Sequence, residues 1–121
     1  MVNVAILGST GSIGLNTLEV IRNFPDKFRV AALSANSNTG LLESQIREFR
    51  PYLACAGTDT AAARLSNTFG RRLNVFSGAQ GLQEMVAQKR IDKVVMSISG
   101  SAALLPLLKA IECRKEIALA N

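Results

Sequence analysis

The sequence predicts an α/β fold, a doubly wound parallel sheet of about six strands with helices on both faces, in three αβα layers. Short apolar runs recur along the 121 residues and alternate with longer segments of helical periodicity. Several of these runs are almost continuously apolar, as in strands that are buried on both faces. A glycine-rich segment directly follows the first run and opens the first helical segment. This arrangement is typical of the Rossmann type of the fold.

Each apolar run has the length of a strand, and each intervening segment has the length of a helix. The predicted strands are Val2–Leu7, Arg29–Ser34, Leu53–Ala56, Asn74–Phe76, Lys93–Ile98 and Glu116–Ala120. The predicted helices are Ile13–Asn23, Gly40–Phe49, Thr60–Phe69, Ala79–Gln88 and Ala102–Cys113. Pro25 and Pro51 stand just beyond the first two helices, where proline ends a helix. Asp59 precedes the third helix and is predicted to cap it.

The order of the elements also predicts a topology and a place for a ligand. Two βαβαβ halves would give the strand order 3-2-1-4-5-6, with ligands bound at the carboxyl ends of the strands, between strands 1 and 4. No linker, internal repeat or low-complexity stretch interrupts the pattern. We therefore expect residues 1–121 to form a single domain.

The turn after the first strand carries Gly8, Gly11 and Gly14, with the spacing G-x-x-G-x-x-G. Glycines at such a turn let the backbone bend sharply and approach a ligand, while free amide groups and the helix dipole attract a phosphate. A dinucleotide is therefore predicted to bind here, with donors from Thr10, Gly11, Ser12 and Ile13. The alternative is a tight strand-to-helix connection without a ligand, and Ser12 is compatible with a capping role in either case.

The end of the second strand indicates which dinucleotide is preferred. No carboxylate lies between Asp26 and Glu43, although enzymes that use NAD place one here to bind the ribose 2′-hydroxyl. Asn36, Ser37 and Asn38 instead offer neutral groups to a 2′-phosphate, which favours NADP. The alternative is a polar turn that caps the second helix.

Two further segments lie at the predicted carboxyl edge of the sheet. The small residues of Ser97–Ser101 would allow a cofactor to pass close to the backbone, or Ser101 would simply cap the last helix. Asn121, which follows the last strand, is a weaker candidate for contact with the nicotinamide ribose.

Composition excludes several other functions. The net charge is +5, but the 14 basic residues are scattered along the sequence, and none of the six aromatic residues lies within a basic stretch. A solvated basic surface is therefore favoured over nucleic-acid binding.

The chain has no histidine, and Cys55 and Cys113 are isolated from each other, so we predict no metal site and two buried free thiols. No run approaches the roughly 18 apolar residues of a membrane span, and no signal segment is evident, so a cytoplasmic domain is expected.

Taken together, the motifs resemble those of the NADPH-binding domain of the 1-deoxy-D-xylulose 5-phosphate reductoisomerase family. The resemblance covers essentially the whole chain. It rests on Ile6–Gly14, Pro25–Val30, Phe49–Pro51, Gly78–Leu82, Leu104–Pro106, Ala110–Ile111 and Ile117–Asn121. Semialdehyde dehydrogenases and dihydrodipicolinate reductases share the glycine spacing but are not expected to end in Ala-Leu-Ala-Asn.

The resemblance implies a concrete activity for the complete protein. Family members isomerise 1-deoxy-D-xylulose 5-phosphate and reduce the product with NADPH to 2-C-methyl-D-erythritol 4-phosphate, with Mg, Mn or Co as a divalent metal, and act as homodimers. The cofactor contacts carried over are Thr10, Gly11, Ser12, Ile13, Asn36, Ser37, Asn38 and Asn121, and Gly8 joins them from the glycine turn. No catalytic or metal-binding residue carries over, because the catalytic domain of the family is not represented in these 121 residues. The alternatives are a stand-alone, non-catalytic nucleotide-binding module and the cofactor domain of another G-x-x-G-x-x-G reductase.

Overall fold

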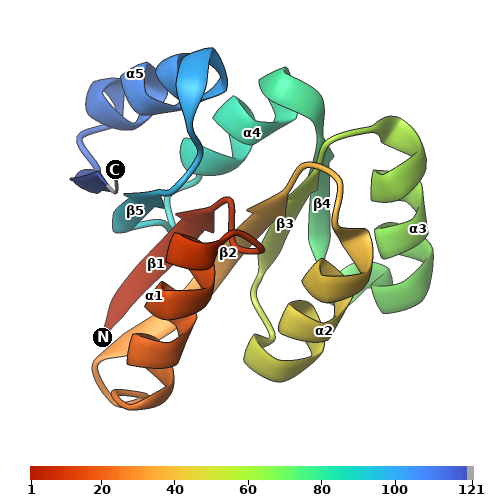
Figure 1. Ribbon diagram of the computed structural model, residues 1–121, viewed down its shortest axis with the longest axis horizontal. Coiled ribbons are helices and arrows are strands. Elements are labelled where there is room, and N and C mark those ends of the chain that lie inside the picture. The colour runs from red at the N-terminus through yellow and green to blue at the C-terminus, as the bar shows by residue number, and fades with distance from the viewer. Residues whose placement is uncertain (120–121) are drawn as a thin grey trace.

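A computed structural model describes residues 1–119 and shows one parallel sheet between two layers of helices (Figure 1). The six strands are β1 (Val2–Leu7), β2 (Phe28–Ala35), β3 (Leu53–Ala56), β4 (Asn74–Ser77), β5 (Lys93–Met96) and β6 (Glu116–Leu119). The five α-helices are α1 (Ser12–Arg22), α2 (Thr39–Phe49), α3 (Asp59–Phe69), α4 (Gly78–Val86) and α5 (Leu104–Glu112). Two 3-10 turns, η1 (Gly70–Arg72) and η2 (Gly100–Ala103), precede β4 and α5. The predicted fold class is confirmed.

The strand order differs from the prediction. The sheet runs β4-β3-β2-β1-β5-β6, so the order reverses between β1 and β5 rather than between the first and fourth strands. Burial gives the reason: Asn74 is exposed and the rest of β4 is only half-buried, which suits an edge, whereas Val94 and Met96 of β5 are buried. Strand β4 therefore continues outward from β3, and β5 takes the interior position beside β1.

The helices divide between the two faces of the sheet according to the direction of winding. Helices α1, α2 and α3 pack on one face, around Leu18, Leu42 and Leu65. Helices α4 and α5 pack on the other, around Met85 and Ala110. Strands β1 to β5 thus send side chains into both hydrophobic clusters, whereas β6 at the edge contributes only Ile117, to the second.

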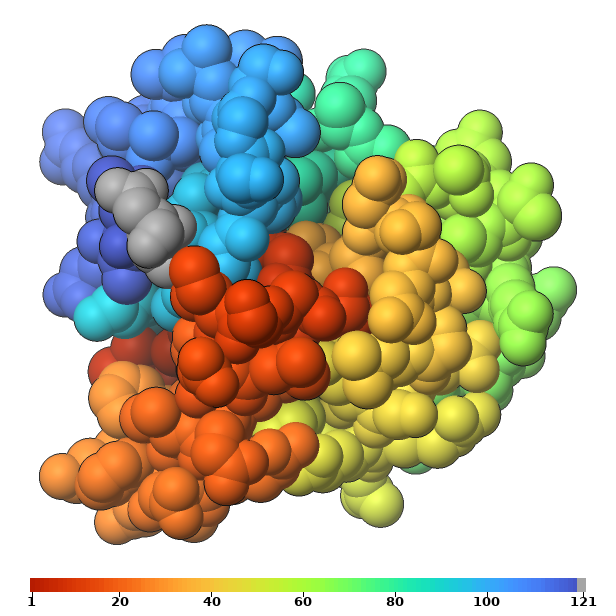
Figure 2. All heavy atoms as spheres, in the orientation of Figure 1, coloured from red at the N-terminus to blue at the C-terminus, as the bar shows by residue number. Residues whose placement is uncertain are grey.

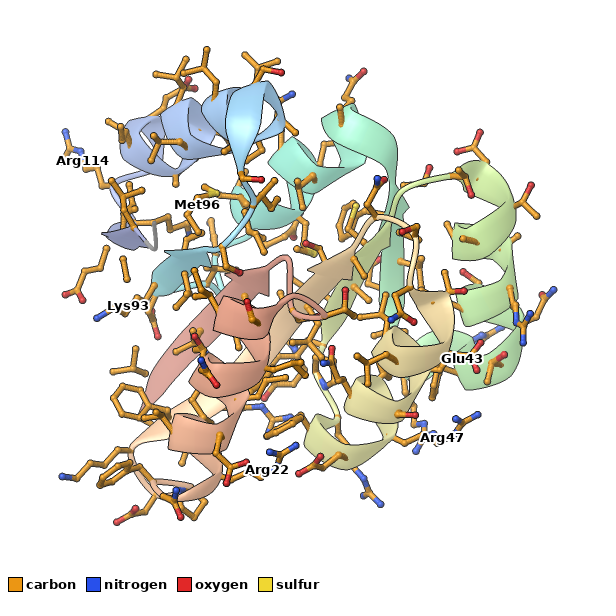
Figure 3. The ribbon with its side chains drawn as sticks, viewed as in Figure 1. Arg22, Glu43, Arg47, Lys93, Met96 and Arg114 are labelled. Atoms are coloured by element: carbon orange, nitrogen blue, oxygen red, sulfur yellow. The ribbon has the colours of Figure 1, made fainter. Side chains whose placement is uncertain are left out.

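Ion pairs connect neighbouring helices on the first of these faces. Figure 3 labels Arg22 of α1 and Glu43 of α2, which take part in them. Arg22 of α1 donates to both carboxylate oxygens of Glu48 on α2, at 2.5 and 2.9 Å. Hydrogen bonding to the Arg22 guanidinium lowers the pKa of Glu48. The largely buried Glu43 side chain of α2 accepts from Arg64 of α3 at 3.1 Å. The Arg22–Glu48 pair is open to solvent and therefore adds little stability, whereas the Glu43 carboxylate is largely buried.

The predicted Asp59 cap is wrong, and so are the alternative capping roles of Ser12 and Ser101. Thr58 rather than Asp59 caps α3, because its hydroxyl accepts from the Ala61 amide at 3.2 Å. Ser12 lies inside α1, whose cap is Gly11 without a side-chain hydrogen bond. Ser101 falls within η2, so it does not cap α5.

Helix α5 is apolar on both its packed and its open side. Leu104, Leu105, Leu108 and Ile111 are each 50–56% exposed, while Pro106 and Ala110 of the same helix are buried. A helix that is hydrophobic all round is typical of one covered on both sides. Within residues 1–119, no helix is long and apolar enough to cross a membrane.

Candidate functional site

The glycine-rich turn lies where the carboxyl ends of β1, β2 and β5 meet. The Gly8 and Ser9 amides donate to the carbonyl of Ser34 at the end of β2, at 3.1 and 2.8 Å. Directly after β5, the Ser97 hydroxyl donates to the carbonyls of Leu7 and Gly8, at 2.5 and 3.1 Å. Gly8 has a φ of +83°, which favours glycine, and an added Cβ would lie 3.1 Å from the Ser97 carbonyl oxygen. The turn is therefore held from both neighbouring strands.

Gly14 allows α1 to begin directly against this turn. A Cβ at Gly14 would meet the backbone of the turn itself, the Gly8 carbonyl oxygen and, at 2.6 Å, the Ser9 Cα. Gly11 differs, because it is exposed and a Cβ there would be 3.8 Å from the nearest atom, the Gly8 carbonyl oxygen. Gly14 is thus required for packing, whereas Gly11 leaves the surface of the turn open.

The first amides of α1 have no acceptor within the described part of the chain. No side chain caps the helix, and no backbone hydrogen bond is donated by Ser12, Ile13 or Gly14 among residues 1–119. Three free N–H groups at the positive end of a helix dipole form a binding site for an anion when a ligand is available. This is the local chemistry that the glycine pattern predicts.

Ser9 and Gln45, which were not predicted as site residues, hold the turn against α2. The buried Ser9 hydroxyl donates to the Gln45 side-chain oxygen at 2.7 Å, and the Gln45 amide donates back to the Ser9 carbonyl at 2.9 Å. The sequence signal was a polar residue on the apolar face of a helix, since Gln45 lies beside Leu42 and Ile46. The pair fixes the turn relative to the second helix.

Replacing Gln45 by leucine is expected to lower the free energy of unfolding by about 2 kcal/mol, because it leaves the buried Ser9 carbonyl without its partner. Urea unfolding followed by circular dichroism measures this. Gln80→Leu is the matched control, because Gln80 is an exposed residue of α4 and should change stability by less than about 0.5 kcal/mol. Equal stability of the two variants would contradict the role given to Gln45.

The turn forms one wall of an open cleft of about 510 Å³. Its other walls are the end of β2 with Asn36 and Ser37, the turns after β3 and β4, and the segment Ser97–Ser99 after β5. Figure 2 shows this face of the molecule hollowed between the segment that follows β5, in light blue, and the segment that follows β2, in amber. No Asp, Glu, Lys or Arg is among the residues that line the cleft.

The cleft brings together five of the predicted contacts. Gly8, Thr10, Gly11, Asn36 and Ser37 line it. Ser12 and Ile13 lie beside it at the start of α1 but do not line it. Asn38 is used as the cap of α2, because its side-chain oxygen accepts from the Leu41 amide at 3.2 Å. Asn121 lies outside the described residues.

Asn36 and Gly57 pack tightly at the back of the cleft. A Cβ at Gly57 would meet both the carbonyl and the side-chain oxygen of Asn36, so only glycine allows the loop after β3 to pass here. The close approach places the exposed Asn36 side chain at the end of β2, facing the cleft. Ser37 follows it, immediately before the cap of α2.

The two cysteines differ in environment, so the prediction of two buried thiols is only half right. Cys55 of β3 is buried at the cleft, and its Sγ lies 3.7 Å from the carbonyls of Ala56 and Gly78. Burial raises the pKa of the Cys55 thiol to about 11. Cys113, which follows α5, is only partly buried, and both thiols are free. A neutral Cys55 at pH 7 is a poor nucleophile.

In a Cys113→Ser variant, the alkylation rate of Cys55 by iodoacetamide should keep rising with pH up to about 11, since only the thiolate reacts. A folded pKa above the unfolded one also means that stability is present below pH 9 and falls as the pH rises toward 11. Cys113 in a Cys55→Ser variant provides the comparison. A rate for Cys55 that levels off below pH 9 would contradict the raised pKa.

No group of three or more His, Cys, Asp or Glu residues that could hold a metal ion occurs within residues 1–119. The site is therefore a neutral cleft built from backbone amides and small polar side chains, and its chemistry is that of binding an anionic ligand.

Known proteins are similar to this chain both in sequence and in fold. A 1-deoxy-D-xylulose 5-phosphate reductoisomerase from Shouchella clausii is 42% identical over 121 residues, which are all of this chain and 32% of that protein. The corresponding protein of a Thermoanaerobacter species is 43% identical over all of this chain and 31% of its own length. The chain thus spans about one third of the length of these relatives.

Two solved structures have closely similar folds over the whole length of this chain. A crystal structure of DOX-P reductoisomerase in complex with NADPH, fosmidomycin and magnesium superposes with a TM-score of 0.93 at 38% identity, over 100% of this chain and 30% of that one. The Zymomonas mobilis enzyme in complex with NADPH gives a TM-score of 0.88 at 33% identity, over 99% and 32%. The sequence model of the 1-deoxy-D-xylulose 5-phosphate reductoisomerase family matches residues 4–121. This chain belongs to that family.

Proposed function

We propose that this chain is the NADPH-binding domain of a 1-deoxy-D-xylulose 5-phosphate reductoisomerase. The observation that carries the proposal is the set of three unpartnered amides at the start of α1, beside a neutral cleft at the carboxyl edge of the sheet. A pyrophosphate supplies the acceptors that these amides lack. NADPH binding to two relatives of solved structure supports the same ligand.

Each end of the cleft has a proposed role toward the cofactor. The unpartnered amides of Ser12 and Ile13 and the hydroxyls of Thr10 and Ser12 hold the pyrophosphate, while Gly8 and Gly11 shape the turn that it approaches.

The adenosine 2′-phosphate is proposed to lie at the turn after β2. Asn36 and Ser37 donate to it there, and the start of α2, capped by Asn38, contributes a positive dipole. Asn121 is proposed to contact the nicotinamide ribose and lies outside the described residues. When bound, NADPH supplies a hydride.

The whole activity requires groups from the remaining length of the family's proteins. We propose that the complete enzyme isomerises 1-deoxy-D-xylulose 5-phosphate and reduces it to 2-C-methyl-D-erythritol 4-phosphate with a divalent metal, as a cytoplasmic homodimer. This chain binds the cofactor and does not catalyse the reaction alone. The exposed apolar side of α5 supports such an arrangement, because it gives the rest of the enzyme a face to pack on.

Titration of the chain with NADPH and with NADH, followed by nicotinamide fluorescence, tests the cofactor assignment. NADPH is expected to bind at least about tenfold more tightly than NADH, since only NADPH carries the 2′-phosphate. Equal affinity for NADPH and NADH, or no binding of either, would refute the cofactor assignment.

The second experiment tests the enzyme itself. The chain is joined to the remaining two thirds of the Shouchella relative, with which it shares 42% identity. NADPH oxidation that depends on both the sugar phosphate and Mg²⁺ or Mn²⁺ supports the proposal. A fusion that binds NADPH but never oxidises it would favour a non-catalytic nucleotide-binding module.

A further inference from the structure

A second site candidate lies at the opposite end of the sheet from the cofactor cleft. Two cavities of about 620 Å³ each adjoin one another there, and both are lined by Tyr52 and Arg72. Their lining residues precede β3, β4 and β5 or begin β2, so they gather at the amino ends of the parallel strands. The carboxyl ends, where the cofactor cleft lies, are at the other edge of the sheet.

Seven cations line these two cavities. One of them, Arg47, lies 3.8 Å from the Glu43 carboxylate, and we call the other six the basic patch: Arg29, Arg50, Arg71, Arg72, Lys89 and Arg90. They are scattered in the sequence, yet they make up six of its 14 basic residues. No Asp or Glu lines either cavity, and none of the six forms a salt bridge within the described residues. The fold therefore concentrates uncompensated positive charge in one place.

Tyr52 organises the centre of the basic patch. The Arg29 guanidinium lies 4.3 Å from the centroid of the Tyr52 ring, and the Arg90 guanidinium lies 4.2 Å from it. Arg29 also donates to the Arg50 carbonyl at 3.2 Å. These contacts restrain the long side chains before any ligand arrives, which lowers the entropic cost of binding.

Arg29 has an unsatisfied hydrogen-bond donor within the basic patch. Its Nε atom is buried and has no hydrogen-bond partner in the described part of the chain. A buried N–H group without an acceptor carries an unfavourable desolvation cost. An anion bound in the adjoining cavities would offset part of this cost electrostatically.

The arrangement favours a compact anion over a nucleic acid. Proteins that bind single strands use aromatic rings on which the bases stack. Both guanidinium contacts to Tyr52 are already made within the chain, and the ring of Phe69, in the second cavity, lies 5.5 Å from Arg47. Guanidinium groups themselves are suited to phosphate oxygens, which they bind in a bidentate manner.

We propose that the basic patch is an anion-binding site, separate from the cofactor cleft, for a compact polyphosphate or the diphosphate group of a small metabolite. Arg72 is its central residue, because it lines both cavities. The site is independent of NADPH, since the two ligands occupy opposite edges of the sheet.

Isothermal titration of the NADPH-saturated chain with inorganic pyrophosphate tests the proposal. Saturation with NADPH blocks the phosphate-binding turn, so any remaining binding reports a second site. A dissociation constant of about 1 mM or tighter is expected at about 0.05 M salt. Arg72→Gln should weaken binding about tenfold, by removing one charge-assisted contact. Arg114→Gln, the same replacement outside both cavities, should change it less than about twofold.

Three outcomes would overturn the proposal. The first is no saturable binding up to about 10 mM pyrophosphate, or loss of all binding when NADPH is present. The second is an equal effect of Arg72→Gln and Arg114→Gln, which would reduce the site to general charge attraction. The third is tighter binding of an oligothymidylate of roughly 20 nucleotides than of pyrophosphate, with the same loss in Arg72→Gln, which would identify a nucleic-acid surface instead. Urea unfolding of each variant establishes that it is folded.

Discussion

Replacing Gly14 by alanine is expected to lower the free energy of unfolding by about 2–4 kcal/mol and to abolish NADPH binding. In an ordinary helix, the same change would add up to about 1 kcal/mol of stability. Here the new Cβ would lie 2.6 Å from the Ser9 Cα and would also meet the Gly8 carbonyl oxygen. These are backbone atoms held by Ser34 of β2 and by Ser97 after β5, so the clash can be relieved only by moving α1 away from the turn.

Gly40→Ala provides the matched control for this prediction. Gly40 lies in the first turn of α2, and a Cβ there would have no neighbour within 4 Å. That variant should therefore be unchanged or up to about 1 kcal/mol more stable. Thermal and urea unfolding measure both changes. A Gly14→Ala protein as stable as the Gly40→Ala protein would show that α1 does not pack on the turn as described.

Gly11→Ala separates binding from folding. Gly11 has an ordinary extended backbone conformation, and an added Cβ would make only one van der Waals contact. Stability should change by less than about 0.5 kcal/mol, while NADPH affinity should fall at least about tenfold, since the methyl group keeps the pyrophosphate from the amides. Unchanged affinity would place the pyrophosphate elsewhere.

The fold could be predicted from the sequence because the spacing of apolar residues reflects which side chains are buried. Continuous apolar runs mark strands that are covered on both faces, and five strand-to-strand connections of helical length leave few alternatives. The position of β4 was not predictable in the same way. Whether a fourth strand pairs beside the third or crosses to the first depends on which face its flanking helices cover, and that is a property of the packed molecule.

The site likewise has a part that a local sequence pattern predicts and a part that only the folded structure shows. The glycine turn is a local pattern, and its role in the backbone follows from its three glycines. The pairing of Ser9 with Gln45 joins residues 36 positions apart, and the basic patch joins cations from Arg29 to Arg90. No local pattern encodes such pairs, because parallel strands bring distant turns to a common edge.

Replacing Ser37 by aspartate is expected to raise the dissociation constant of NADPH about 10- to 100-fold and that of NADH less than about threefold. The cleft has no charged lining residue, so a new carboxylate has no neighbouring cation there to neutralise it. At a separation of a few ångströms, its repulsion of the 2′-phosphate amounts to about 1.4–2.8 kcal/mol after solvent screening. NADH lacks that phosphate, so its dissociation constant should be nearly unchanged.

A loss of stability cannot account for such a loss of NADPH affinity in the Ser37→Asp variant. Ser37 is exposed and immediately precedes the cap of α2, where a negative charge is favourable toward the helix dipole. The aspartate variant should therefore be at least as stable as the parent. Ser37→Asn keeps the site neutral and should retain most of the affinity for NADPH. The repulsion should weaken at high salt, because charges that are open to solvent are screened. If NADPH and NADH lose affinity equally, the 2′-phosphate does not lie at this turn. Its recognition would then have to come from another part of the cleft.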